Sequence, residues 1–234
     1  MSNQSERSSG ARLSRAAIID AALSLVDLKG PAGLSMRALG AKLGVEAMSL
    51  YRHVHGKEDL LEGVVDELTA ELVVVMEREA AGHWQTFLQN VAHAVRDIAV
   101  AHPRAFPLIA TRHPAAPWLR PPLRSIEAVD IFLRVLLQHG FTDEQAVGAY
   151  RGFSSFLIGQ LLLEAAVRGA DVGGTLAGQG ETGPGSTGEA QIASLDDAPE
   201  VRRLRPLLSE DHSKEEFDTA LEILLDRLEV DLSL

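Results

Sequence analysis

The chain has 234 residues, of which 46% are hydrophobic and 24% are charged. This length and balance predict a folded protein with room for a small domain and one of ordinary size. It contains no cysteine, which excludes disulfides, thiolate chemistry and cysteine-based zinc sites. No apolar run approaches the roughly 18 residues of a membrane span, and residues 1–12 lack the apolar centre of a signal peptide. We therefore expect a cytoplasmic protein without membrane contacts, beginning with a disordered arm over residues 1–12.

The charge is unevenly distributed along the chain. The formal net charge is −11, but residues 1–60 hold eight Lys/Arg against six Asp/Glu, a balance of +2. The remaining residues hold 14 basic and 27 acidic side chains, a balance of −13. Any phosphate-binding face is therefore expected in the N-terminal quarter, with an acidic body that DNA would repel.

Helical periodicity predicts a series of helices in the first third of the chain, and no stretch alternates long enough for a sheet. Ser14 and Ser35 are positioned to cap the first two helices, and Gly44 ends the second. The predicted helices cover residues 15–28, 35–43, 46–53 and 57–78.

The rest of the chain also has helical patterns, interrupted by a Gly-rich segment over residues 169–199 that we expect to be a flexible loop. The sequence therefore predicts an all-α protein. A helix-turn-helix head over residues 13–60 would be joined by a long helix to a helical effector-binding and dimerisation body over residues 61–234. The predicted helices of the body cover residues 84–101, 104–111, 123–139, 143–168, 200–208 and 213–230.

The segment Leu34–Lys57 has the pattern of a helix-turn-helix, with two short helices joined by a tight turn at Gly44. Leu39 and Leu50 would anchor the pair so that the second helix can enter the major groove. Lys57 begins the next helix, where its ammonium and the free backbone N–H groups can hold a phosphate. A plain helical hairpin with a solvated polar face would show the same pattern. The candidate DNA-contacting residues are Arg37, Glu46, Ala47, Met48, Ser49, Tyr51, Arg52, His53 and Lys57.

Three motifs, LSMRALGAKLGV, LYRHV and K-x-x-LL, occur in that order within the first seventy residues. Together they resemble the TetR family of transcriptional regulators. The runs HWQTFLQN, TRHP and QHGF further along resemble the C-terminal domain of the tetracycline-repressor branch. The resemblance implies a homodimer that binds double-stranded operator DNA and a small-molecule effector. It places Arg37, Ala47, Met48, Ser49, Tyr51 and His53 against DNA, with Lys57 as the phosphate anchor.

The sequence departs from the tetracycline repressors at functional positions. Ala47 stands where they have a longer polar residue, Met48 replaces a proline and Arg52 a tryptophan, so the operator is expected to differ. The positions that hold the drug and its magnesium ion correspond to Val73, Leu108, Val91 (with Asn90 adjacent) and Leu163 (with Glu164 adjacent). Leucine and valine supply no ligand for Mg²⁺, so we expect no metal, no cofactor and an effector other than magnesium–tetracycline.

We expect a mainly apolar effector pocket between the central helices of the body. Arg112 and Gln160 are candidates because long polar side chains inside a helical body need a partner. The aromatic residues could instead belong to an ordinary core. The candidate pocket residues are Phe87, Val91, Val95, Leu108, Arg112, Phe132, Phe153, Phe156 and Gln160.

Two helices, 144–168 and 214–230, carry wide apolar stripes that could form a four-helix bundle between two chains. Gly148, Gly152 and Gly159 would allow close approach on the first. The same stripes could instead close the core of a single chain. They comprise Phe153, Phe156, Leu157, Leu161 and Leu162 on the first helix, and Phe217, Leu221, Leu224, Leu225 and Leu228 on the second.

The sequence as a whole predicts a transcriptional repressor released from a palindromic operator by a small molecule. A regulator without an effector, or an activator, is the alternative. No nucleophile–base pair or pair of carboxylates has a spacing that suggests catalysis, so we do not expect an enzyme.

Overall fold

The computed structural model describes residues 13–111, 113–171 and 198–232. Every regular element in these ranges is a helix, which confirms the predicted all-α class. The predicted arm over residues 1–12 and most of the predicted loop over 169–199 lie outside the described residues, as does Arg112. None of the described helices is long and apolar enough to cross a membrane.

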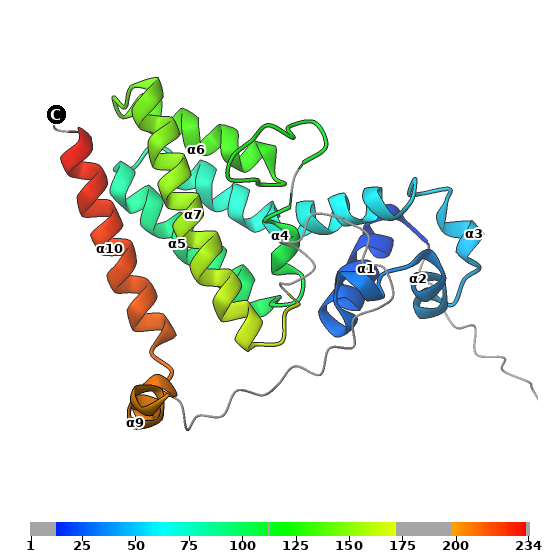
Figure 1. Cartoon of the computed structure of the whole chain (residues 1–234). Coiled ribbons are helices and arrows are strands. Elements are labelled where there is room, and N and C mark those ends of the chain that lie inside the picture. Colours follow the sequence, from blue (N-terminus) through cyan, green and yellow to red (C-terminus); the bar gives the residue numbers. More distant parts are fainter. Residues whose placement is uncertain (1–12, 112, 172–197, 233–234) are drawn as a thin grey trace, which may run out of the picture.

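The molecule has a small head, a larger helical body and one long helix that runs from one into the other (Figure 1). The long helix is where the sequence predicts it, and it therefore belongs to both units. The head consists of α1 (Arg15–Lys29), the 3₁₀ turn η1 (Pro31–Gly33), α2 (Met36–Leu43) and α3 (Ala47–Leu50), and the long helix is α4 (Lys57–Glu79).

Side-chain caps explain where the head helices begin. The Ser14 Oγ accepts a hydrogen bond from the backbone N–H of Ala17 (3.2 Å), and Ser35 does the same for Ala38 (3.1 Å). Each bond satisfies one of the N–H groups that the first turn of a helix leaves unpaired. Gly44 ends α2 with a φ of 68°, a left-handed conformation that glycine adopts without strain.

The two helices of the helix-turn-helix touch through their backbones at Gly40. A Cβ on this residue would lie 2.8 Å from the carbonyl oxygen of Val45 and 3.2 Å from the nitrogen of Ala47. The Gly40 carbonyl oxygen also accepts a hydrogen bond from the Val45 N–H (2.9 Å). The angle between α2 and α3 therefore depends on the absence of a side chain at Gly40.

The third helix is shorter than the sequence predicts. The prediction covered residues 46–53, whereas α3 ends at Leu50 and residues 51–53 form a turn. The N–H groups of His53 and Val54 both donate to the Leu50 carbonyl (2.9 and 3.1 Å), which tightens the chain and buries Val54 completely. This turn redirects the chain toward α4.

An ion pair joins the start of α1 to the start of α4. The Arg15 guanidinium donates to both carboxylate oxygens of Asp59 (2.6 and 2.9 Å), and the His55 backbone N–H donates to the same carboxylate (2.7 Å). These bonds, chiefly those from Arg15, lower the pKa of Asp59 to about 2. The first turn of α4 is thus held firmly by the head.

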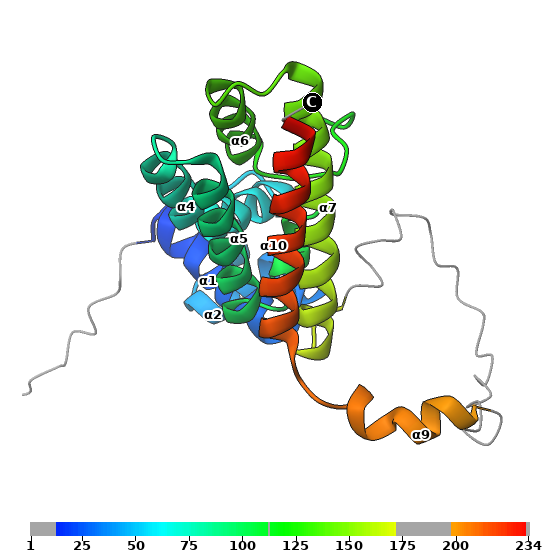
Figure 2. The same ribbon diagram turned by 90° about the vertical axis from the view of Figure 1, so that its left-hand side faces the viewer.

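The body is a layered bundle in which α9 stands away from the other helices (Figure 2). The predicted helix over residues 104–111 is only a 3₁₀ turn, and the one predicted from residue 123 begins three residues later because Ser125 caps it. The elements of the body are α5 (Trp84–Ala101), η2 (Phe106–Leu108), α6 (Ile126–Gln138), α7 (Asp143–Val167), α9 (Pro199–Leu208) and α10 (Ser213–Leu232).

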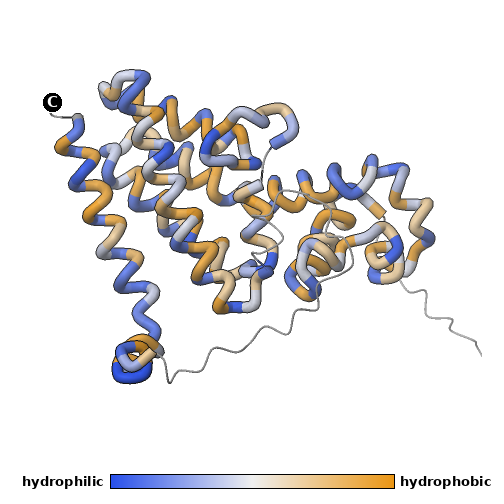
Figure 3. The backbone as a smooth tube through the Cα atoms, in the orientation of Figure 1, coloured by the Kyte–Doolittle hydropathy of each residue, from blue (hydrophilic) through white to orange (hydrophobic). Residues whose placement is uncertain are grey.

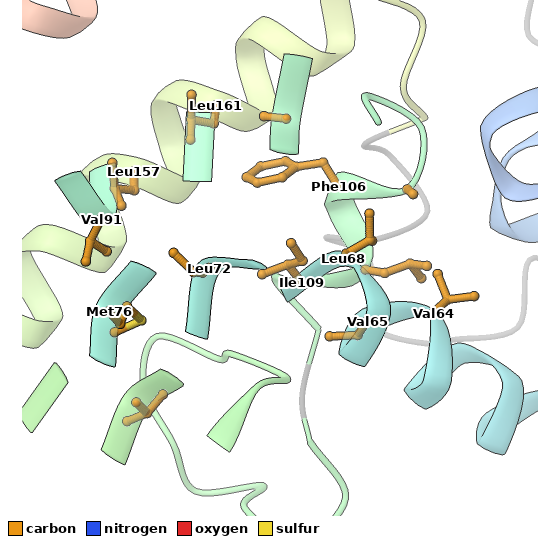
Figure 4. Packing of buried hydrophobic residues seen from close by; sticks show 14 of the residues in the cluster. Val64, Val65, Leu68, Leu72, Met76, Val91, Phe106, Ile109, Leu157 and Leu161 are labelled. Atoms are coloured by element: carbon orange, nitrogen blue, oxygen red, sulfur yellow. The ribbon is translucent and has the colours of Figure 1, made fainter. Parts of the chain in front are cut away.

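One continuous apolar core extends from the head through the body. Hydrophobic residues recur along α4 to α7, whereas the first half of α10 is mainly hydrophilic (Figure 3). Figure 4 shows Phe106 and Ile109 between Leu68 of α4 and Leu161 of α7. Burying such a side chain contributes about 1.5–3 kcal/mol, so the packing of Phe106 and Ile109 helps to fix α4 and α7 relative to each other.

Gly40→Ala is expected to lower the free energy of unfolding by about 1–3 kcal/mol, since the added Cβ must displace the backbone of the turn or of α3. Thermal and urea unfolding followed by circular dichroism would measure the change. Ala41→Ser, on the exposed neighbouring position, should stay within about 0.5 kcal/mol of the parent protein. A Gly40→Ala variant that gained stability, as alanine does in an open helix, would contradict this account.

Candidate DNA-binding surface and effector cavity

The helix α3 lies at the outer end of the head (Figure 1) and carries part of the predicted DNA-contacting set, whose other members lie in α2, in the turns that flank α3 and at the start of α4. Met48 is 74% exposed and Tyr51 47% exposed, although both are large and partly apolar. Below them Leu50 is completely buried and fastens α3 to the head. The exposed members of the predicted set are Arg37, Glu46, Met48, Tyr51, Arg52 and Lys57, and the half-buried members are Ala47, Ser49 and His53.

The N-terminus of α4 lies next in the chain. Gly56 precedes Lys57 and supplies no side-chain cap, so the N–H groups of the first turn donate no hydrogen bond to a capping side chain. Lys57 is exposed at this end of the helix. An ammonium beside uncapped N–H groups suits a phosphate oxygen, and its role as phosphate anchor stays a prediction.

The body contains a cavity of about 70 Å³ between α4, α5, α6 and α7. Side chains of these four helices and of the segment between α5 and α6 line it, and most of them are hydrocarbon. The wall consists of Thr69, Leu72, Met76, Val91, Val95, Phe106, Ile109, Leu123, Ser125, Ala128, Val129, Phe132, Tyr150, Phe153, Ser154, Leu157 and Ile158.

The structure brings part of the predicted pocket together at this cavity. Val91, Val95, Phe132 and Phe153 line it. Arg112 lies outside the described residues.

The other predicted pocket residues are not on the cavity wall. Phe87 is fully buried and packs against Phe132 (ring centroids 6.4 Å apart), and Phe156 stacks on Phe217 of α10 (5.7 Å). Leu108 is buried within η2, and Gln160 is half-buried on α7. For the two phenylalanines, the alternative of an ordinary core describes the structure better.

The polar groups of the wall already have partners inside the protein. The Thr69 hydroxyl donates to the Val65 carbonyl (2.8 Å), and the Tyr150 hydroxyl donates to the Pro121 carbonyl (2.9 Å). Burial raises the pKa of Tyr150 to about 12, while a hydrogen bond with Ser154 acts in the opposite direction. The wall therefore presents a ligand with shape and hydrocarbon rather than with free charge.

Sequence reasoning missed the contribution of α4 to this wall. Leu72 and Met76 are both buried on α4, but the apolar stripe that helical periodicity predicts there includes Leu72 and not Met76. Periodicity could not separate core positions from cavity positions, because both require the same residue types. The contributions of Phe106 and Leu123 depend on how the Pro-rich segment folds back, which no local pattern indicates.

The polar residues adjacent to the positions that correspond to tetracycline-binding residues have hydrogen-bond partners away from the cavity wall. Asn90 donates to Glu79 (2.9 Å), and the buried Glu164 carboxylate receives Arg96 (2.8 and 3.2 Å) and Arg168 (3.0 Å). Leu163 is 70% exposed. Among the residues that the structure describes, no three His, Asp or Glu side chains gather as a metal site would require.

Comparison with known proteins places both parts of the chain. Residues 18–64 match the family described as bacterial regulatory proteins, tetR family. Residues 78–232 match the tetracyclin repressor-like C-terminal domain, and this second match alone covers more than half of the chain.

Individual proteins agree with this assignment. The class D tetracycline repressor of Escherichia coli is 35% identical over 154 residues, an alignment that covers 65% of this chain and 66% of the repressor, just under two thirds of its length. A possible TetR family regulator from Streptomyces coelicolor A3(2) superposes with a TM-score of 0.68 at 25% identity, covering 92% of this chain and 98% of that one. A TetR variant from Acinetobacter baumannii AYE in complex with minocycline, at 22% identity and a TM-score of 0.63 over 95% of this chain and all of that one, shares the fold. The chain therefore belongs to the tetR family of bacterial regulatory proteins, as a helix-turn-helix transcriptional regulator with a tetracycline-repressor-like C-terminal domain.

Proposed function

We propose that this protein is a homodimeric repressor that leaves a palindromic operator when an uncharged, mainly apolar small molecule occupies the cavity. The position of α4 carries this proposal. Thr69, Leu72 and Met76 form one wall of the cavity, and Lys57 begins the same helix beside α3. Similarity to a repressor named for tetracycline supports a ligand-controlled mode of action. Catalysis forms no part of this function.

The wall of the cavity favours an effector other than magnesium–tetracycline. Its hydroxyl groups are engaged inside the protein, and its other lining groups are almost entirely hydrocarbon. A charged or metal-bound ligand would lose its hydration shell there without gaining hydrogen bonds in return. A neutral aliphatic or aromatic compound has little hydration to lose and gains the hydrophobic contribution of the wall.

The effector would act by shifting the body toward a conformation with a larger cavity. The present volume of about 70 Å³ is well below the roughly 300–1,000 Å³ of pockets that enclose drug-sized ligands. A ligand of that size has to displace at least one wall. Displacing α4 moves the head, because α4 is continuous from the cavity to Lys57.

The small volume also favours a second candidate function, a regulator that binds DNA without an effector. In that case the cavity would be a packing defect between four helices. An activator would use the same head, and the two modes differ in their effect on transcription rather than in the fold.

The dimer that we propose uses a different face of the two C-terminal helices from the stripes identified in the sequence. Phe153, Leu157 and Leu161 of α7 are buried within the chain's own core, as are Phe217 and Leu221 of α10. The alternative that these stripes close a single chain describes them better. The helices still present an outer face on which apolar side chains are exposed, namely Val147, Leu163 and Val167 on α7 and Ile223 and Val230 on α10.

Glycines on the outer face of α7 support its use as an interface. A Cβ at Gly148, Gly152 or Gly159 would meet no atom within 4 Å. Glycine in an exposed helix costs about 1 kcal/mol relative to alanine, and a partner helix in close approach would account for three of them. A two-fold pair of heads would then present two α3 helices about 34–36 Å apart, one turn of DNA.

Selection of bound sequences from random duplex DNA is expected to yield a palindrome with half-site centres separated by about one helical turn or a multiple of it. On that DNA, Lys57→Gln should weaken binding uniformly and reduce the salt dependence by about one phosphate contact, whereas Tyr51→Ala should also relax sequence preference. Lys29→Gln removes an exposed charge at the C-terminal end of α1 and serves as the control. Retention of full affinity by both head variants would contradict the assigned surface.

Ala128→Leu places three more carbon atoms at the cavity wall and is expected to imitate a bound effector. Operator affinity measured by fluorescence anisotropy should fall at least tenfold, about 1.4 kcal/mol, while thermal unfolding remains cooperative. Ala101→Leu, the same substitution at an exposed position, should leave affinity unchanged. If Ala128→Leu folds and binds the operator like the parent, the regulator without an effector becomes the better description.

Gly152→Leu is expected to dissociate the dimer, because the larger side chain would separate α7 from the partner helices. Sedimentation equilibrium should show the dissociation constant raised at least tenfold. Ala70→Leu, at an exposed position of α4, is the matched control. In a monomeric protein the same Gly152 substitution would only improve helix propensity, so a more stable variant with an unchanged mass would refute the proposed interface.

A further inference from the structure

Arg124 is a buried charge beside the cavity. Its side chain is only 6% exposed, and its chain neighbours Leu123 and Ser125 both line the cavity. Its backbone N–H donates to the carbonyl of Ile109 (3.0 Å), another lining residue. The backbone of Arg124 therefore lies between two residues that line the cavity and is hydrogen-bonded to a third.

The guanidinium has few bonds for a buried charge. One nitrogen donates to the Glu58 carboxylate (3.2 Å) and another to the Thr111 hydroxyl (3.4 Å). The Nε is buried and has no hydrogen-bond partner among the described residues. Losing a carboxylate partner is costly for a buried charge, because water cannot replace it. Arg124 therefore resists separation from Glu58.

Glu58 belongs to the part of α4 that the head controls. It lies in the first turn, between Lys57 and Asp59, and Asp59 is held by Arg15 of α1. Adjacent carboxylates in one helical turn are thus bound by different parts of the protein, Glu58 by Arg124 beside the cavity and Asp59 by Arg15 of the head.

From this arrangement we infer that the Arg124–Glu58 ion pair is the contact through which the cavity wall sets the position of the head. This inference rests on the proposed function and specifies its regulation. A ligand that displaces Leu123 and Ser125 moves Arg124 with them. Because an unpartnered buried guanidinium is unfavourable, the first turn of α4 follows, and Lys57 and α3 move with it. Arg124 is a positioning residue in this scheme and touches neither DNA nor ligand.

The absence of cysteine from the chain allows a direct test. Cysteines replacing exposed Ala41 on α2 and Asp130 on α6 would carry spin labels that report the distance from head to body. Diluting labelled chains into unlabelled protein restricts the measurement to single chains. Ala128→Leu then serves as a permanent cavity occupant, with Ser154→Ile on the facing wall as a second occupant if the first variant fails to fold.

We expect the cavity variant to shift the head–body distance in the parent background and to lose at least half of that shift in the Glu58→Gln background. Glu67→Gln, which removes an exposed carboxylate from the same helix, should keep the full shift. Glu58→Gln leaves the buried Arg124 guanidinium without its carboxylate, so the thermal unfolding midpoint should also fall. A merely structural ion pair would change stability without changing the transmitted shift.

Equal shifts in the Glu58→Gln and parent backgrounds would overturn the inference, and so would the absence of a shift in the parent with both cavity variants. The DNA selection described above decides the proposed function separately. A protein that selects no duplex DNA would refute the repressor, whereas the distance measurement, which needs neither DNA nor effector, would still decide the role of Arg124.

Discussion

The continuity of α4 is the constraint on which the rest of the molecule depends. A helix cannot bend sharply without breaking backbone hydrogen bonds, and no proline or π-bulge interrupts Lys57–Glu79. Its head end is fastened by Arg15 and by packing against α1, and its body end forms a wall of the cavity. Neither unit can change its contact with α4 without some effect on the other.

The boundaries of the head could be predicted because they depend on local chemistry. Ser14 and Ser35 cap helices through their own side chains, and Gly44 ends one through its own backbone freedom. The early end of α3 was missed because it serves the burial of Val54, a residue beyond the helix. Tertiary packing overrode a helical pattern that was locally consistent.

The candidate sites differed in how far the sequence could identify them. Exposed Met48 and Tyr51 follow from the polarity pattern of a short amphipathic segment. The cavity does not follow from such a pattern, because Phe87 and Phe132 are both buried apolar helix residues and only Phe132 lines the cavity. The three glycines predicted to lie at a dimer interface are exposed on α7, whereas most of the apolar stripe predicted for the same interface lies inside the chain. A periodic stripe identifies burial without identifying the partner.

The hydroxyl groups of the cavity wall that already donate to backbone carbonyls have a consequence for discrimination among compounds. A site that recognises a molecule through unpaired polar groups rejects a close analogue by several orders of magnitude, whereas a hydrocarbon surface distinguishes one methylene by only about 1–3 kcal/mol. Because the Thr69 and Tyr150 hydroxyls already donate to carbonyls of the chain, the affinities of homologous compounds for the cavity would differ only gradually. Such a regulator would respond to a series of related compounds, and the affinity of each compound would depend on how closely it fits the cavity.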